Sequence, residues 1–261
     1  MPERGRRGKR DDAPLVREMD ARHVARAMGH LTLVRHGQAS ALTGDYDRLS
    51  ERGHAQAKLL GAYWAARGTT FDHVFVGPRR RHRETYENVR DALAAAGTPL
   101  PAPVPLEELD EHHGIVVFLA AMPKLMATHP EIAELAANVE TAGGRLRLFR
   151  RVMRLWAEDR IAELHPEDAE RFDAFVARVR RGLSLMTYGA EHGARIAAFT
   201  SAGATAAAAC LALGIDDARA MDLSFEIVNG SLTRLRFSKD RLTLSSMNET
   251  PHLPDDMLTN V

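Results

Sequence analysis

Cysteine is nearly absent from this chain, because Cys210 is the one thiol among 261 residues. A single cysteine cannot form an internal disulfide, which favours a reducing compartment. The alanines that precede it, residues 206–209, indicate a core position rather than a catalytic thiol. A chain of this length can bury enough apolar surface to fold without disulfides or a structural metal.

Long hydrophobic runs are also lacking. No apolar stretch approaches the length needed to span a bilayer. The basic N-terminal residues are not followed by an apolar segment of the kind found in signal peptides. We therefore expect a cytoplasmic protein with no membrane partner.

Net charge is the third absence, since 35 basic residues balance 35 acidic ones. No global field steers the chain to nucleic acid, and no basic groove with interleaved aromatic residues is visible, so we expect no nucleic-acid partner. Basic residues do crowd positions 4–10, where they indicate either a polyanion-binding tail or a solvated extension. We favour a polar, disordered extension over residues 1–28, because charge blocks without apolar spacing rarely order by themselves.

Strands and helices alternate in the first part of the chain. Residues 30–34 form a short apolar, β-branched run typical of a buried strand. Ser50 is placed to cap a helix that runs to Arg67, and residues 71–76 predict a second strand followed by a helix from about Arg79 to Ala96. This order indicates a parallel α/β sheet.

The second part of the chain begins with a long stretch of helical spacing. Residues 115–192 show little strand character and predict several helices, an insertion placed to cover an active site. Strand pattern returns at residues 195–200. Residues 225–228, 231–237 and 241–246 predict edge strands, with a tight turn at Asn229-Gly230. We expect a three-layer α/β/α domain over residues 29–261, with a mostly parallel central sheet and this helical insertion.

Polar groups follow three of the predicted strands. They are Arg35-His36, the arginines at 79–81, and Thr200-Ser201. The carboxyl ends of parallel strands meet at one edge, where ligands bind. Guanidinium groups match phosphate oxygens bidentately, and an imidazole among them stays neutral and available as a nucleophile. Gly37 allows the backbone to turn sharply beside a ligand.

Four segments then carry a resemblance. Residues 31–40, Leu-Thr-Leu-Val-Arg-His-Gly-Gln-Ala-Ser, resemble the opening of the histidine phosphatase superfamily, the phosphoglycerate-mutase-like enzymes. Residues 49–57 resemble the family's Leu-Ser, Gly, Gln-Ala helix start, and residues 247–253 its Asn and His-Leu ending. Residues 71–85 resemble its second strand and the segment Ser-Pro-Leu-x-Arg-Ala-x-Gln-Thr, with Gly77 in place of the serine and Arg81 on the arginine.

The resemblance implies a metal-independent phosphomonoester hydrolase that acts on a small phosphorylated substrate. His36 would attack phosphorus and become a phosphohistidine, while Arg35 and Arg81 would hold the phosphoryl oxygens. Gly37 and Gln38 would line the phosphate site. The two guanidinium groups would replace the metal ion used elsewhere, so no cofactor is expected.

The resemblance also implies a carboxylic acid that protonates the leaving group. Residues 107, 108, 110 and 111 are all acidic. We favour Glu111, because residues 109–112 resemble a variant frame of some small phosphatases, with Glu108 as the alternative and a substrate contact. Such an acid should be buried enough to raise its pKa towards neutrality.

One departure from the family pattern stands out. Ser201 occupies the position where most members carry a second histidine. A serine hydroxyl can donate to a phosphate oxygen but brings no imidazolium charge. His112 or His113 would be candidates to reach in as substitutes, and solvated loop histidines are the other interpretation. The replacement also motivates a second functional hypothesis, a weak or inactive relative that binds a phosphorylated ligand as a sensor. A mutase is less favoured, and the oligomeric state stays open.

Overall fold

The computed structural model describes residues 28–40 and 47–260. The extension expected over residues 1–28 lies outside the described residues except for Met28, so it stays a prediction. Within the described ranges the chain builds one six-stranded sheet in the order β3-β2-β4-β1-β5-β6. The strands are β1 (Gly29–Arg35), β2 (His73–Val76), β3 (Pro103–Pro105), β4 (Arg195–Thr200), β5 (Leu232–Ser238) and β6 (Arg241–Glu249).

The sheet is mostly parallel, as predicted. β4 pairs in parallel with β1 on one side and β2 on the other, and β2 pairs in parallel with β3. The two pairings that involve β5 are antiparallel. Consequently the carboxyl ends of β2, β4 and β1 lie side by side, with β4 in the middle.

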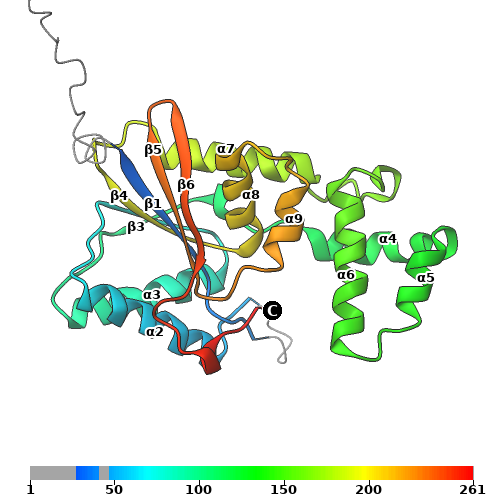
Figure 1. Cartoon of the computed structure of the whole chain (residues 1–261), viewed down its shortest axis with the longest axis horizontal. Coiled ribbons are helices and arrows are strands. Elements are labelled where there is room, and N and C mark those ends of the chain that lie inside the picture. Colours follow the sequence, from blue (N-terminus) through cyan, green and yellow to red (C-terminus); the bar gives the residue numbers. More distant parts are fainter. Residues whose placement is uncertain (1–27, 41–46, 261) are drawn as a thin grey trace, which may run out of the picture.

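Helices cover both faces of the sheet (Figure 1). One layer holds α2 (Glu51–Ala66) and α3 (Arg80–Ala95), and the other holds α7 (Phe172–Thr187), α8 (Ala202–Leu213) and α9 (Arg219–Ser224). The alternation within β1 explains the two cores, because Leu31 and Leu33 pack in the cluster that includes α7 and α8 while Val34 packs with α2 and α3. The three-layer α/β/α prediction is confirmed.

Local signals account for the helix boundaries. The Ser50 hydroxyl accepts a hydrogen bond from the Gly53 N–H, which makes Ser50 the N-cap of α2 as predicted. Gly97, just beyond α3, adopts φ +76°, a left-handed conformation suited to glycine at a helix end. Cys210 is fully buried in α8, and burial raises the pKa of its thiol to about 11, which confirms the core position.

Three further helices stand to one side of the sheet in Figure 1: α4 (Gly114–Thr128), α5 (Pro130–Ala136) and α6 (Ala142–Ala157). In the described ranges no single helix is long and apolar enough to cross a membrane, although α4 and α5 pass that test together despite a bend of 114° between them. Val117, Ala121 and Leu125 place one side of α4 in the core.

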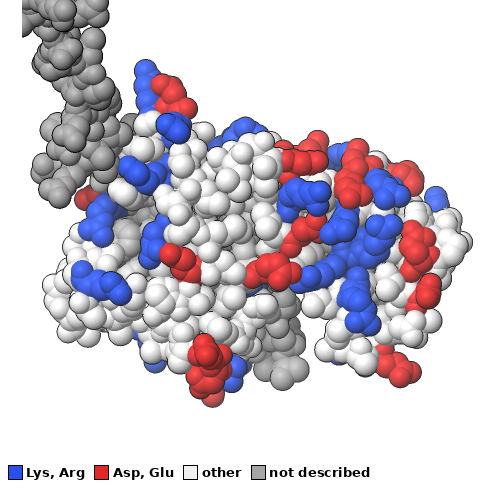
Figure 2. Space-filling model, in the orientation of Figure 1, with Lys and Arg blue, Asp and Glu red and all other residues white. Residues whose placement is uncertain are grey.

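Charges of both signs are interspersed on the face shown in Figure 2, with basic side chains gathered over the helical part at the right. Two arginines of α6 pair with acidic residues across a pocket next to α9. Arg150 pairs with Glu226 at 2.8 Å, and Arg154 pairs with Asp222 at 2.5 Å. Much of this positive charge is therefore balanced locally.

The prediction of a strand at residues 225–228 is wrong. α9 ends at Ser224 and the following residues are irregular, so Asn229-Gly230 does not join two strands. These two residues instead line the end of β1, where the Gly230 N–H donates to the His36 carbonyl at 3.0 Å. The hairpin that does form joins β5 to β6. The sequence indicates a turn at these two residues, but their contact with His36, which is distant in sequence, determines which segments the turn connects.

Candidate active site

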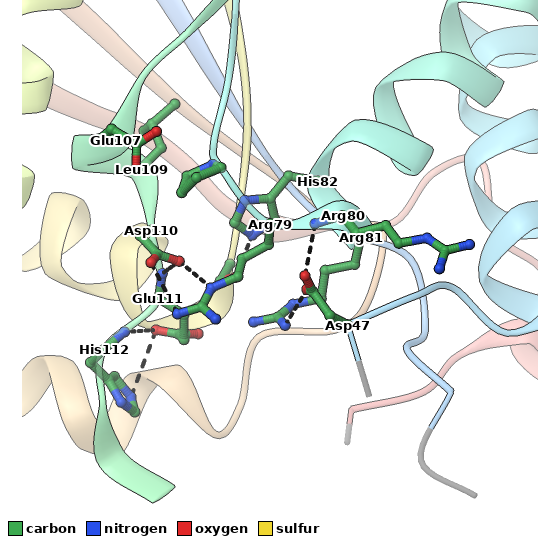
Figure 3. A network of polar contacts seen from close by, with 12 residues as sticks. Asp47, Arg79, Arg80, Arg81, His82, Glu107, Leu109, Asp110, Glu111 and His112 are labelled. Carbon is green, nitrogen blue, oxygen red and sulfur yellow. Dashed lines mark hydrogen bonds and ion pairs between the residues drawn. The ribbon is translucent and has the colours of Figure 1, made fainter. Parts of the chain in front are cut away.

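The three adjacent strand ends bring the predicted polar groups together. β1 delivers Arg35 and His36, and β4, its parallel neighbour, is followed by Ser201. β2 leads through Gly77 into α3, whose first turn carries Arg81 and His82. Four of these polar side chains form a chain of contacts that is described below: Arg81 with His36, His36 with His82, and His82 with Ser201. Figure 3 shows the α3 side of this cluster.

His36 is held with one ring nitrogen committed. Its Nδ1 lies 2.7 Å from the Gly37 carbonyl oxygen, so Nδ1 carries the proton and donates. The other nitrogen, Nε2, therefore presents its lone pair. Arg81 Nε donates to that lone pair at 3.1 Å. The side chain is buried, with 4% of the residue exposed.

The environment of His36 favours the neutral ring. Burial lowers the pKa of His36 well below its usual value of 6.5, and the positive charges of Arg81 and Arg35 lower it further. A neutral imidazole with a fixed tautomer is a competent nucleophile at physiological pH. The surroundings of His36 thus agree with the expectation that its imidazole is neutral.

The two predicted guanidinium groups flank His36 and are themselves anchored. Arg35 donates through Nη1 to the Ile227 carbonyl. Arg81 donates through Nη1 to Asp47 Oδ1 at 3.0 Å, and its side chain is only 8% exposed. Asp47 also accepts from the Arg80 N–H at the start of α3, at 3.0 Å, so a carboxylate binds the group expected to hold phosphate (Figure 3).

Gly37 is required by packing as well as by a turn. A Cβ at this position would lie 2.4 Å from the Gly53 carbonyl oxygen, so only glycine lets β1 meet the start of α2. The Gly37 N–H donates to Thr85 Oγ1 at 3.1 Å. Gln38 is tied to α2, because its N–H donates to Gln56 Oε1 at 2.8 Å and its own Oε1 accepts from Ser50 Oγ at 2.9 Å.

Of the two candidate acids, Glu111 lies in this cluster. Its Oε2 accepts from the Gly203 N–H at 3.2 Å, at the start of α8 and beside Ser201. Glu108 belongs to a short 3-10 turn and its Cβ packs towards Gly182 of α7, so the structure does not bring it to His36.

The expected rise in the pKa of Glu111 is wrong for the structure as it stands. Burial acts to raise this pKa, but the nearby His112, the backbone N–H of His112 and the charge of Arg81 outweigh it and lower the pKa. Sequence alone identified the carboxylate but not the donors that reach it.

Neither substitute histidine sits against His36. The His112 ring packs against Trp156 and Phe175, with centroid distances of 5.5 and 5.4 Å, and its Nε2 lies 3.7 Å from Glu111 Oε1. His113 accepts from the Glu170 N–H at 3.3 Å. The ring beside His36 belongs to His82, with a centroid distance of 5.8 Å.

His82 is the site residue that the sequence reasoning missed. Its Nε2 lies 2.6 Å from Ser201 Oγ, and the residue is fully buried. A signal was present, because Tyr86, Val89 and Leu93 of α3 follow it at helical spacing and are buried on the same face. The run of arginines around it made that face look solvated.

No group of three or more His, Cys, Asp and Glu side chains suited to a metal ion is found among residues 28–40 and 47–260. Fold and site together define an α/β protein whose candidate ligand site, rich in guanidinium and imidazole groups, lies at the carboxyl edge of its sheet. The chain belongs to the histidine phosphatase superfamily (branch 1), whose sequence profile matches residues 31–117 and 126–250.

Known relatives include both mutases and phosphatases. A 2,3-bisphosphoglycerate-dependent phosphoglycerate mutase of Mesorhizobium japonicum is 41% identical over 70 residues, a match that spans 24% of this chain and only 34% of that relative. The alpha-ribazole phosphatase of Shigella flexneri superimposes with a TM-score of 0.53 at 20% identity, covering 85% of this chain and 96% of that one. A mycobacterial glucosyl-3-phosphoglycerate phosphatase superimposes with a TM-score of 0.57 at 20% identity, covering 85% and 99%. At such identities the structural likeness establishes the fold alone.

Proposed function

We propose that this protein is a metal-independent phosphomonoester hydrolase that forms a phosphohistidine on His36. The observation that carries the proposal is the state of His36, a buried ring with its proton on Nδ1, a lone pair on Nε2 and two guanidinium groups around it. Membership of the superfamily and the phosphatases among its structural neighbours support the choice of reaction.

The reaction has two displacements at phosphorus. His36 Nε2 attacks, the ester P–O bond breaks, and the leaving alkoxide takes a proton from the Glu111 carboxyl group. Water then attacks the phosphohistidine, Glu111 accepts its proton, and the P–N bond breaks to release phosphate and neutral His36. Arg35 and Arg81 stabilise the negative charge that spreads over the phosphoryl oxygens.

Glu111 has to be protonated for the first displacement although its pKa is lowered in the structure. A phosphate dianion near Glu111 adds negative charge and takes Arg81 as its own partner. Both changes favour the protonated carboxyl group. Binding of the substrate therefore raises the pKa of Glu111, which proton donation to the leaving group requires.

The nucleophile is tested by hydrolysis of an aryl phosphate in the presence of a chelator. We expect turnover by the wild type, loss of at least about 10³-fold in kcat for His36→Ala, and an acid-labile phosphoenzyme that only the wild type forms. His73→Ala removes an exposed histidine of β2 and serves as the matched control. Equal rates for wild type and His36→Ala would refute the role of His36.

The acid is tested by the leaving group. Glu111→Gln should slow an alkyl phosphate about 10²–10⁴-fold and an aryl phosphate much less, because an aryloxide leaves without protonation. Glu108→Gln, the matched control, should behave as wild type with both substrates. An equal effect of Glu111→Gln on both esters contradicts the assignment.

The alternative is a sensor that binds a phosphorylated ligand without turning it over. Two observations favour it: Ser201 stands where a second histidine is expected, and Arg81 donates to the lone pair that must attack. Tight binding of phosphate with no hydrolysis across a panel of small phosphate monoesters would select the sensor over the enzyme.

A further inference from the structure

His82 and Ser201 form a buried pair for which the reaction above has assigned no role. Their 2.6 Å contact joins α3 to the residue that follows β4, directly between the ends of β2 and β1. Both side chains are fully buried, and the His82 ring lies beside that of His36. Burying such a polar pair costs free energy, and His82 Nδ1 has no hydrogen-bond partner among the described residues, so the presence of the pair beside His36 needs an explanation.

The Ser201 hydroxyl does not form the hydrogen bond that is expected of a serine at a helix N-cap. Ser201 is the N-cap of α8, but its hydroxyl caps no backbone N–H of that helix. The Glu111 carboxylate instead accepts from Gly203 at the start of α8. Serine at an N-cap normally accepts from the first turn of its own helix. Here the hydroxyl is committed to the imidazole.

Space for the imidazole depends on a third residue. A Cβ on Gly77 would lie 2.3 Å from His82 Nδ1, a distance that no packed side chain tolerates. Glycine at the end of β2 therefore leaves room for this ring. Gly77, His82 and Ser201 are three of the positions where this chain departs from the family segments described above, alongside Arg79 and Glu84, and these three lie next to one another.

We propose that His82 and Ser201 together fill the role of the missing second histidine, with His82 as a positioning residue and Ser201 as the group that touches phosphate. His82 Nε2–H donates to Ser201 Oγ, which leaves the Ser201 O–H directed at a phosphoryl oxygen of the group on His36. A hydroxyl both donates and accepts, so it can relay the contact. This inference rests on the proposed phosphatase reaction and deepens it.

A matched pair of substitutions at position 82 separates positioning from packing. His82→Gln keeps an N–H donor of similar reach, whereas His82→Leu fills similar volume without one. We expect kcat to fall on the order of 10²-fold in His82→Leu, with KM little changed and substantial recovery in His82→Gln. Ser201→Ala should match His82→Leu, and the double variant should be no worse than either, since the two residues act as one unit. Equal rates for the Gln and Leu variants, or additive losses, overturn the proposal.

An exchange of positions provides the second test. Ser201→His alone should be inactive, because it crowds the His82 ring, whereas His82→Ala/Ser201→His should recover at least about tenfold over either single variant. Gly77→Ala should impair the wild type more than the exchanged variant, where only the Leu109 carbonyl oxygen, 3.0 Å from the added Cβ, still crowds the methyl group. Melting temperatures of all variants report on folding. Failure of the exchanged variant to exceed the singles, with melting temperatures maintained, refutes the shared role.

Failure of this inference is distinguishable from failure of the phosphatase reaction. If the wild type turns over and His36→Ala does not, while His82→Leu is as fast as the wild type, the reaction stands and the role of His82 falls. If the wild type shows no turnover, calorimetric titration with inorganic phosphate replaces the rate, and about tenfold weaker binding by His82→Leu than by His82→Gln supports the pair. Equal binding by the two variants refutes it.

Discussion

Because Asp47 pairs with Arg81, we expect Asp47 to compete with phosphate for that guanidinium group, and its removal should strengthen phosphate binding. The Asp47 carboxylate accepts from Arg81 Nη1 and from the Arg80 N–H, both at 3.0 Å. Because the Asp47 side chain is 39% exposed, solvent screens the pair and it contributes no more than about 1 kcal/mol. A phosphate that displaces Asp47 from Arg81 therefore loses about 1 kcal/mol of its binding free energy. Asp47→Asn should therefore lower the Kd for inorganic phosphate about fivefold.

The assay is calorimetric titration with inorganic phosphate at low and high ionic strength. The gain in Asp47→Asn should shrink as salt rises, since salt screens exposed charges. Asp91→Asn is the matched control, because it changes the net charge equally and Asp91 lies beside Arg90 on α3, the helix that carries Arg81; it should leave Kd unchanged. Weaker phosphate binding by Asp47→Asn would show that Asp47 orients Arg81 for the ligand, which would refute the competition argument.

Three further outcomes follow from the site and its supports. The lowered pKa of Glu111 predicts that kcat/KM for an alkyl phosphate falls as the pH rises from the acid range below pH 4.5, where Glu111 loses its proton, and keeps falling towards neutrality, while the lowered pKa of His36 keeps that ring neutral; a profile that rises through pH 7 would contradict this. Gly37→Ala should cost about 1–3 kcal/mol in urea unfolding, because its Cβ would press on the Gly53 carbonyl; an unchanged midpoint would disprove that packing argument. Burial lowers the pKa of His252 to about 4, so the unfolded chain binds the extra proton and stability drops by roughly 3 kcal/mol between pH 6.5 and 4; the drop should be smaller in His252→Gln, measured by thermal melting across that range.

Periodicity and capping predicted the parts of the fold that depend on local sequence. The apolar run of β1, the Ser50 cap of α2 and the buried spacing of α3 each reflect neighbouring residues alone. The strand wrongly expected at residues 225–228 shows the limit, because that segment is held by remote partners. Its Ile227 carbonyl accepts from Arg35, and its Val228 N–H donates to Asn248. Hydrogen bonds between residues so distant in sequence produce no periodic pattern of residue types from which they could be predicted.

The candidate site was predictable where one strand end carries the chemistry, as with His36. It was not predictable where two distant segments meet. The contact between His82 and Ser201 joins residues that are 119 positions apart, and neither residue can be assigned to the site until the fold brings the other beside it. Likewise, the lowered pKa of Glu111 reflects donors from the start of α8 and from His112, whose convergence only the fold decides.

The close approach of Gly77 to His82 has a consequence for how such a site is reached by mutation. A Cβ at position 77 would lie 2.3 Å from His82 Nδ1, so the His82 ring keeps its place only while position 77 is glycine. The Ser201 hydroxyl already lies 2.6 Å from His82 Nε2, so we expect a larger histidine side chain at position 201 to compete with His82 for the same space. We therefore expect the effect of a substitution at any one of the three positions to depend on the residues at the other two.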